Sequence, residues 1–205
     1  MTFERHRKLA DAARALNAKH RDKVGTGMAL PALFFFTDGV RTPNPLAAIE
    51  KLSEGCGVVF RHYDVAKRAA LATAVATACA AQDRLCLVAG GADLATNVGA
   101  GGVHLPEHML RKLTIRPKMP IVTTAAHSVD VLLRAQDLGL DAVFLSPVFA
   151  TPSHPDAVAL GVDNFTQLVR ETTLPVYGLG GITEENAGLL AGSGGVGLAA
   201  IGGLL

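Results

Sequence analysis

The segment IVTTAAHSVDVLLRAQDLGLDAVFLS, residues 121–146, shows the unit from which most of the chain is built. An apolar run at 121–125 predicts a buried strand, residues 128–138 have helical periodicity, and a second apolar run at 142–146 predicts another strand. Strands that are apolar on both faces and separated by a helix are typical of a parallel sheet with crossover helices. This segment therefore indicates an α/β protein.

The same alternation extends outward in both directions from this segment. An open doubly wound sheet would use only about five or six strands, so a larger number favours a small closed (β/α)8 barrel, or TIM barrel. The last apolar run ends close to residue 205, so we expect the eighth helix to be missing or truncated. Eight strands are expected, at residues 32–37, 57–61, 85–89, 102–105, 121–125, 142–146, 176–179 and 195–201, with helices at, for example, residues 45–52, 64–81, 128–138, 164–171 and 184–191.

Residues 4–23 predict an additional amphipathic helix with Leu9, Ala13 and Leu16 on its apolar stripe. We assign residues 1–27 to an N-terminal helical extension and residues 28–205 to the barrel domain. Two roles for the extension are open. It packs over the barrel wall in place of the missing eighth helix, or it serves as an arm in a dimer.

The composition excludes several classes of partner. With 19 Lys and Arg against 18 Asp and Glu, the chain has no strong field to gather nucleic acid or an anionic membrane. No run approaches the roughly 20 apolar residues of a membrane span, and no apolar segment of an export signal follows the N-terminus. The three cysteines show no metal-ligand spacing and are expected to be reduced. We therefore expect a cytoplasmic protein with no nucleic-acid or membrane partner and no metal site.

The clearest local signal is GLGGIT, residues 178–183, at the end of the seventh expected strand. Barrels of this kind bind ligands at the C-terminal ends of their strands, often with a phosphate between the seventh and eighth loops. Glycines let the backbone approach an anion, and free N–H groups at a helix start donate to phosphate oxygens. We expect phosphate binding by Gly180, Gly181, Ile201 and Gly202; the alternative is that these glycines serve only tight packing.

Other polar residues at strand ends are candidates for the same site. Thr151 and Ser153, in a long loop after the sixth strand, are expected to bind phosphate. His127 and His154 are the candidates for general acid or base catalysis. For Arg61, a phosphate contact and an ion pair with Asp38 are both open.

Six short segments, taken in their order and spacing, form a recognisable set. They are Phe36-Thr37-Asp38, Gly101-Gly102-Val103-His104-Leu105, Ala126-His127-Ser128, Asp141-Ala142-Val143-Phe144, Pro147-Val148-Phe149-Ala150-Thr151, and Gly180-Gly181-Ile182-Thr183 with Asn186. Together they resemble the thiamin phosphate synthase and TenI (thiazole tautomerase) superfamily, from about Leu33 to the end of the chain. The resemblance implies a small TIM barrel in thiamin biosynthesis that binds a thiazole phosphate and forms a homo-oligomer.

The superfamily contains two activities, and the departures from its pattern bear on the choice. The synthases are transferases that join the thiazole to a pyrimidine diphosphate with Mg²⁺. Their Asn-Asp-Asp-like run after the third strand is Ala89-Gly90-Gly91 here, and the Asp that follows their next strand is absent from Pro106-Glu107-His108-Met109. Two of their lysines are absent as well. Hard cations need oxygen ligands, so we expect Mg²⁺ only if synthase activity is retained, and otherwise no cofactor.

The losses favour a TenI-like tautomerase, an isomerase that handles no diphosphate. Its proton-transfer histidine would lie where this chain has Pro147, so His127 or His154 is expected to replace it. Two alternatives stay open: a non-catalytic phospholigand sensor or carrier, and another barrel enzyme such as a phosphoribosyl-type isomerase.

Overall fold

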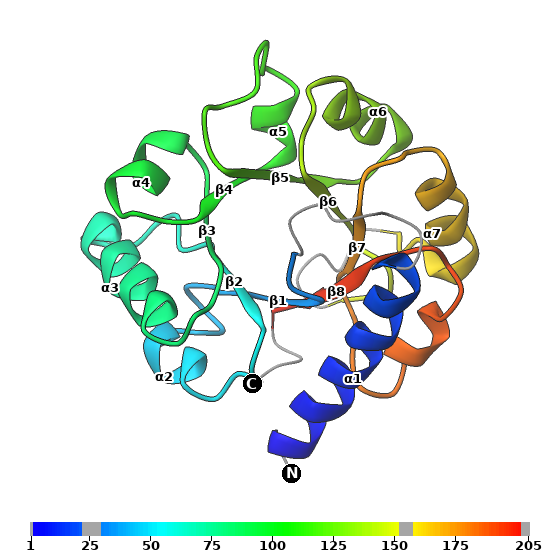
Figure 1. The fold of residues 1–205 in the computed structure, drawn as a ribbon, viewed down its shortest axis with the longest axis horizontal. Coiled ribbons are helices and arrows are strands. Elements are labelled where there is room, and N and C mark those ends of the chain that lie inside the picture. The colour runs from blue at the N-terminus through cyan, green and yellow to red at the C-terminus, as the bar shows by residue number, and fades with distance from the viewer. Residues whose placement is uncertain (1, 22–29, 152–157, 202–205) are drawn as a thin grey trace.

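Eight parallel strands close into a barrel in the order in which they follow along the chain (Figure 1). The computed structural model describes residues 2–21, 30–151 and 158–201. This architecture confirms the predicted (β/α)8 barrel. The strands are β1 (Leu33–Phe36), β2 (Gly57–Phe60), β3 (Cys86–Ala89), β4 (Gly102–Leu105), β5 (Ile121–Ala126), β6 (Ala142–Leu145), β7 (Val176–Leu179) and β8 (Gly197–Ala200).

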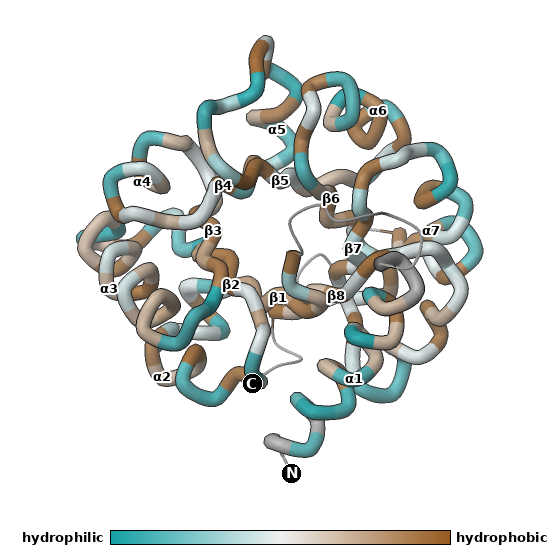
Figure 2. Tube along the Cα trace, in the orientation of Figure 1, coloured by the Kyte–Doolittle hydropathy of each residue, from teal (hydrophilic) through white to brown (hydrophobic). Residues whose placement is uncertain are grey.

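Helices surround the barrel on its outer side, and the strands that they cover are strongly apolar (Figure 2). The α-helix predicted at residues 184–191 is wrong, because only a short 3-10 helix forms within this segment. The Asn186 side chain accepts from the Thr183 amide and donates to the Gly181 carbonyl, which holds the chain in a turn before a helix begins. The helices are α1 (Thr2–Arg21), α2 (Pro45–Ile49), α3 (Arg68–Ala80), α4 (Ala92–Asn97), α5 (Glu107–Leu110), α6 (Val129–Asp137), α7 (Gly161–Arg170) and the 3-10 helix η1 (Ala187–Leu190).

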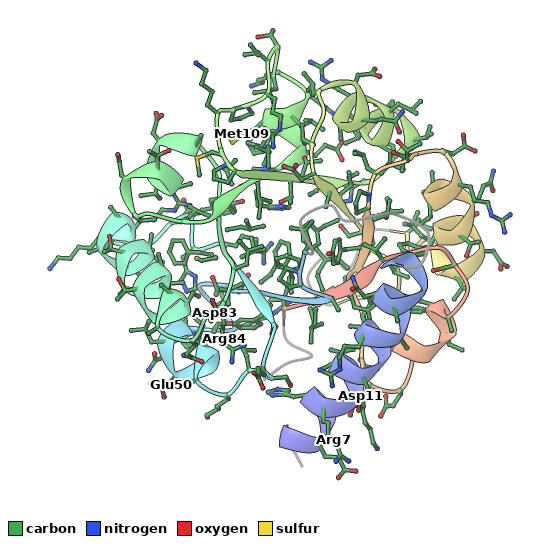
Figure 3. All side chains as sticks on the ribbon, viewed as in Figure 1. Arg7, Asp11, Glu50, Asp83, Arg84 and Met109 are labelled. Atoms are coloured by element: carbon green, nitrogen blue, oxygen red, sulfur yellow. The ribbon has the colours of Figure 1, made fainter. Side chains whose placement is uncertain are left out.

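The core has two layers, one between strands and helices and one inside the barrel. Aromatic rings dominate the inner layer: Phe34, Phe144 and Tyr177 lie with their centroids 5.0 to 5.3 Å apart. The Tyr177 hydroxyl donates to the Pro31 carbonyl at 2.9 Å, so the buried ring keeps a partner for its polar end. Between α2 and α3, the Arg84 side chain (Figure 3) donates to the Leu52 and Ser53 carbonyls and fastens the turn before β2.

Helix α1 packs outside β1 and β8, between α2 and the 3-10 helix η1 (Figure 1). Its stripe residues Leu9, Ala13 and Leu16 are buried and belong to the same core layer as the strands. The Asn17 side chain donates to the Val196 carbonyl just before β8, at 3.0 Å. The helix therefore covers the barrel wall, as the first of the two sequence hypotheses expects.

In residues 2–21, 30–151 and 158–201, no helix combines the length and the apolar character needed to cross a membrane.

Leu9→Ala tests whether α1 contributes to the stability of the whole barrel. Leu9 is completely buried, so we expect a loss of about 2 to 4 kcal/mol in the free energy of unfolding, from lost transfer energy and the cavity left behind. Lys8→Ala, on the exposed side of the same helix, is the control and should change it by less than about 0.5 kcal/mol. Urea unfolding followed by circular dichroism measures both. Equal effects of the two variants would mean that the helix is not part of the cooperative core.

Candidate functional site

A pocket of about 840 Å³ opens at the C-terminal ends of the strands. All eight strand ends contribute to it, and its walls are largely apolar, as is common for small-molecule sites. The pocket lies where the sequence predicted it. Its lining consists of Phe36, Arg61, Tyr63, Gly90, His104, Pro106, Glu107, His108, Met109, Arg111, Ala125, His127, Ser146, Pro147, Thr151, Leu179, Gly180 and Ile201.

His104 forms part of the pocket floor and is almost fully buried. Its Nδ1 shares a hydrogen bond of 3.0 Å with the Thr123 hydroxyl, and its ring lies edge-on to Phe36 and Phe144. Burial, together with the nearby Arg61 cation, lowers the pKa of His104 to about 3. The floor therefore presents a neutral imidazole in an aromatic setting.

His127 follows β5 directly and reaches the pocket. Its Nδ1 lies 2.6 Å from the Ser146 carbonyl oxygen. A carbonyl only accepts, so Nδ1 carries the proton and a neutral ring has its lone pair on Nε2. In the part of the chain that the structure describes, this Nε2 has no protein partner, so it can act as a proton acceptor.

The carboxylate of Glu107 lies beside His127 at the rim of the pocket. Its Oε2 accepts the His127 backbone N–H at 3.0 Å, and its Oε1 lies 2.7 Å from Arg111 Nη2. Arg111 also lies 2.8 Å from the Asp130 carboxylate, through Nη1. Both carboxylate oxygens of Glu107 are therefore already engaged within the protein.

Arg61 lines the pocket and lies 2.6 Å from Asp38 through Nη2, so the ion-pair alternative for Arg61 is present in the structure. Burial alone would raise the pKa of Asp38, but the Arg41 and Val40 amides and the Arg61 guanidinium hold it below its ordinary value. The Nε of Arg61 is buried and has no acceptor among the described residues, so Arg61 keeps a donor for a further partner. A phosphate contact by Arg61 stays a prediction.

Behind Arg61, a buried chain of hydrogen bonds fixes the loop between β1 and α2. His62 Nε2 lies 3.2 Å from the Thr42 carbonyl and must donate to it, so His62 Nδ1 accepts from the Thr37 hydroxyl at 2.9 Å. The same hydroxyl accepts the Arg61 N–H at 3.0 Å. Burial lowers the pKa of His62, which favours the neutral imidazole that these hydrogen bonds require.

The glycine corner, Gly180 and Gly181, has left-handed backbone angles with φ of +92° and +66°. A Cβ on Gly180 would lie 2.9 Å from Pro147, and one on Gly181 would lie 2.5 Å from the Ala150 carbonyl oxygen. The Phe149 amide donates to the Gly180 carbonyl at 3.0 Å, so the β6 loop is fastened to this corner. Tight packing is thus a sufficient reason for both glycines, and it leaves phosphate binding there untested.

The structure brings together the described members of the predicted site. Arg61, His127, Thr151, Gly180 and Ile201 all line the one pocket, and Gly181 follows Gly180 directly. Ser153, His154 and Gly202 lie outside the described residues, so their predicted roles stay predictions.

Met109 and Arg111 are among the pocket residues that the sequence analysis did not name as site candidates. Met109 lies within α5, where Figure 3 labels it, and Arg111 directly follows that helix. Helix α5 has four residues, Glu107–Leu110, which is too short for a periodic pattern to mark one of its faces. The only available signal was the position of these residues shortly after the end of β4.

Groups of three or more His, Cys, Asp or Glu side chains that could hold a metal ion do not occur within residues 2–21, 30–151 and 158–201. The three cysteines are free and buried.

The closed parallel barrel and the pocket above its strand ends define a (β/α)8-barrel protein with a pocket of the size of a small-molecule site. The sequence profile of a family described as thiamine monophosphate synthase matches residues 35–204. The chain belongs to this thiamine monophosphate synthase (TMP-TENI) family.

Individual relatives agree with this membership. The chain is 35% identical over 181 residues to an Aquifex aeolicus (strain VF5) protein named as a candidate thiamine-phosphate synthase 2, which covers 85% of this chain and 97% of that protein. It is 36% identical over 118 residues to the thiamine-phosphate synthase of Ruminiclostridium cellulolyticum, covering 55% of each. A solved thiamine phosphate pyrophosphorylase from Pyrococcus furiosus has a TM-score of 0.66 at 23% identity, over 82% of this chain and 84% of that one, which shows the shared fold.

His104→Phe tests the neutral imidazole at the pocket floor. An unfolded histidine takes up a proton below about pH 6.5, whereas folded His104 resists protonation down to about pH 3. The stability that depends on a neutral His104 is therefore complete above about pH 6.5 and is lost as the pH falls toward 3, by about 2 kcal/mol at pH 5. Phe keeps the ring contacts and loses the bond to Thr123, which costs about 1 kcal/mol.

We therefore expect the His104→Phe variant to be less stable than the parent at pH 7.5 and more stable at pH 5. Urea unfolding at both pH values measures the difference. Parallel pH curves for the two proteins would contradict the assignment of a neutral His104.

Gly181→Ala tests the packing of the glycine corner. The new methyl group would meet backbone oxygens of the β6 loop at a positive φ, so we expect a loss of about 2 to 3 kcal/mol. Gly91→Ala is the matched control, because its φ is −76° and a Cβ there meets nothing within 4 Å. Its stability should change by less than about 1 kcal/mol. Thermal unfolding compares the two, and an equally mild effect at Gly181 would show that the corner is loose.

Proposed function

We propose that the pocket binds a thiazole phosphate and moves a proton on its ring, as a tautomerase of the TenI type does. The observation that carries this proposal is the state of the charged groups around the pocket. The carboxylates of Asp38 and Glu107 and the guanidinium groups of Arg61 and Arg111 are paired with one another within the protein. The imidazole of His127, whose Nε2 has no partner among the described residues, is our candidate for the proton acceptor.

The residues present do not fit a magnesium–diphosphate site. Mg²⁺ takes oxygen ligands, chiefly carboxylates. Glu107 uses one oxygen for Arg111 and the other for the His127 amide. Asp38 uses one for the Val40 and Arg41 amides and the other for Arg61. We derive no step through a metal.

A single phosphate is a better match for this pocket than a diphosphate. Backbone N–H groups bind an anion through their dipoles and need no unpaired cation. Gly180 and Ile201 line the pocket at the β7–β8 corner. The Gly181 and Ile182 amides have no acceptor among the described residues. We propose this corner for the phosphate, with Thr151 from the β6 loop beside it.

Proton transfer then needs only one group that accepts and returns a proton. Nε2 of His127 takes a proton from a carbon of the thiazole-derived ring, while its Nδ1–H stays on the Ser146 carbonyl and stabilises the imidazolium. The proton returns to another atom of the same ring. No atom is gained or lost by the ligand, and the imidazole ends neutral as it began.

His127→Asn tests this assignment. With a carboxylated thiazole phosphate as substrate, we expect its rate of isomerisation to fall by about 10² to 10⁴. Binding of 4-methyl-5-(2-hydroxyethyl)thiazole phosphate should be retained, with a stabilisation near 2.7 kcal/mol at about a hundred times the dissociation constant. Isomerisation is followed by NMR, and binding by thermal shift.

The competing activities are separated in the same experiment. Pyrimidine diphosphate, thiazole phosphate and Mg²⁺ together should give no thiamin phosphate, and robust formation of that product would refute the proposal. Binding without isomerisation by the parent protein would identify a phospholigand carrier instead.

A further inference from the structure

The carboxylate of Glu107 holds the main chain at His127, and we propose that Glu107 is a positioning residue for the His127 imidazole. This inference rests on the proposed function, because it takes His127 as the proton carrier. Glu107 stands at the start of α5, after β4, and its side chain is only 18% exposed. Its Oε2 accepts the His127 N–H at 3.0 Å.

His127 needs such a support because of its place in the fold. It is the first residue beyond β5, so the strand ladder no longer holds its backbone. Its backbone N–H donates to Glu107, and its ring Nδ1–H donates to the Ser146 carbonyl at 2.6 Å, with the Ser146 hydroxyl oxygen at a longer 3.4 Å from the same Nδ1. The first bond is charge-assisted and therefore about twice as strong as a neutral one. Together they tie the end of β5 to the loops after β4 and β6.

Arg111 fixes the direction of the Glu107 carboxylate. Its Nε and Nη2 lie 2.9 and 2.7 Å from Glu107 Oε1, which leaves Oε2 for the His127 amide. Its Nη1 donates to Asp130 on α6 at 2.8 Å, and the other oxygen of Asp130 accepts from the Ser128 hydroxyl. A continuous set of charged contacts therefore connects α5 with the turn that contains His127.

This set of contacts contributes geometry more than stability. Arg111 is about half exposed, and exposed ion pairs add at most about 1 kcal/mol. A proton-transfer group displaced by about 1 Å, however, can lose a hundredfold in rate. The consequence of losing Glu107 should therefore appear in kcat and in the state of the His127 ring, with little change in folding.

Glu107→Ala and Glu107→Gln are the test pair, with Asp137→Asn on the exposed side of α6 as the control. Glutamine keeps one oxygen, enough for the His127 N–H or for Arg111 but not for both, whereas alanine keeps none. Protein labelled with ¹⁵N-histidine reports the His127 tautomer through its imidazole shifts, assigned by comparison with His127→Asn. Isomerisation kinetics give kcat and KM, and a thermal melt checks folding.

We expect Glu107→Ala to lower kcat by about 10- to 100-fold with KM within about twofold, and to replace the single Nδ1–H signal by a mixture of tautomers. Glu107→Gln should lose less than Glu107→Ala in kcat, because it keeps one of the two acceptors, and Asp137→Asn should match the parent. If the alanine variant does not fold, Arg111→Ala removes the support for the carboxylate and is read in the same way.

An unchanged His127 signal in a folded Glu107→Ala variant would overturn the inference. Should the parent protein isomerise no thiazole, the proposed function fails, but the ¹⁵N comparison still decides on the positioning. A change of tautomer then supports it, and no change refutes it.

Discussion

Aromatic rings inside the barrel determine where a ligand can be bound. Phe34, Phe36, Phe144 and Tyr177 pack edge to face or tilted, with centroid distances of 5.0 to 5.3 Å. They belong to the packed core inside the barrel, and the pocket lies above them at the C-terminal strand ends. His104 is a polar side chain in direct contact with this aromatic cluster, and its burial keeps it neutral. The apolar floor of the pocket is thus a consequence of how the barrel is filled.

Above that floor, the charges around the pocket neutralise each other in pairs. Asp38 with Arg61, and Glu107 with Arg111, place opposite charges 2.6 to 2.7 Å apart. A highly charged ligand would compete with these carboxylates for the two guanidinium groups, and the competition matters more at the less exposed pair, Asp38 with Arg61. A monoester held by backbone amides would leave both pairs intact. The pairing is therefore the basis of our proposal that the pocket takes a monoester rather than a diphosphate.

The barrel could be predicted from the sequence because each strand is a short run of apolar residues that face both sides of the sheet. Such a run is visible in the local sequence without knowledge of distant contacts. It also predicted which strand ends carry the described polar residues of the pocket. The choice between an ion pair and a phosphate contact for Arg61 was beyond it, since Asp38 lies 23 residues away and only the closed barrel brings them together. The helix expected at 184–191 failed for a related reason. The bonds of Asn186 to Thr183 and Gly181 compete with helical hydrogen bonds, and such competition leaves no mark on hydrophobic periodicity.

The glycine corner shows how packing and binding can depend on the same residues. Gly180 and Gly181 allow the loop after β6 to lie directly against the end of β7, where Val148 and Phe149 donate to the Leu179 and Gly180 carbonyls. The carbonyls at this corner are thereby used within the protein, while the amides of Gly181 and Ile182 have no acceptor among the described residues. Because a carbonyl oxygen would repel an anion and an N–H would attract it, this division supports the proposal that the corner takes a phosphate. The packing reason for the glycines and their proposed role in binding are therefore compatible, and the first provides the rigidity that the second requires.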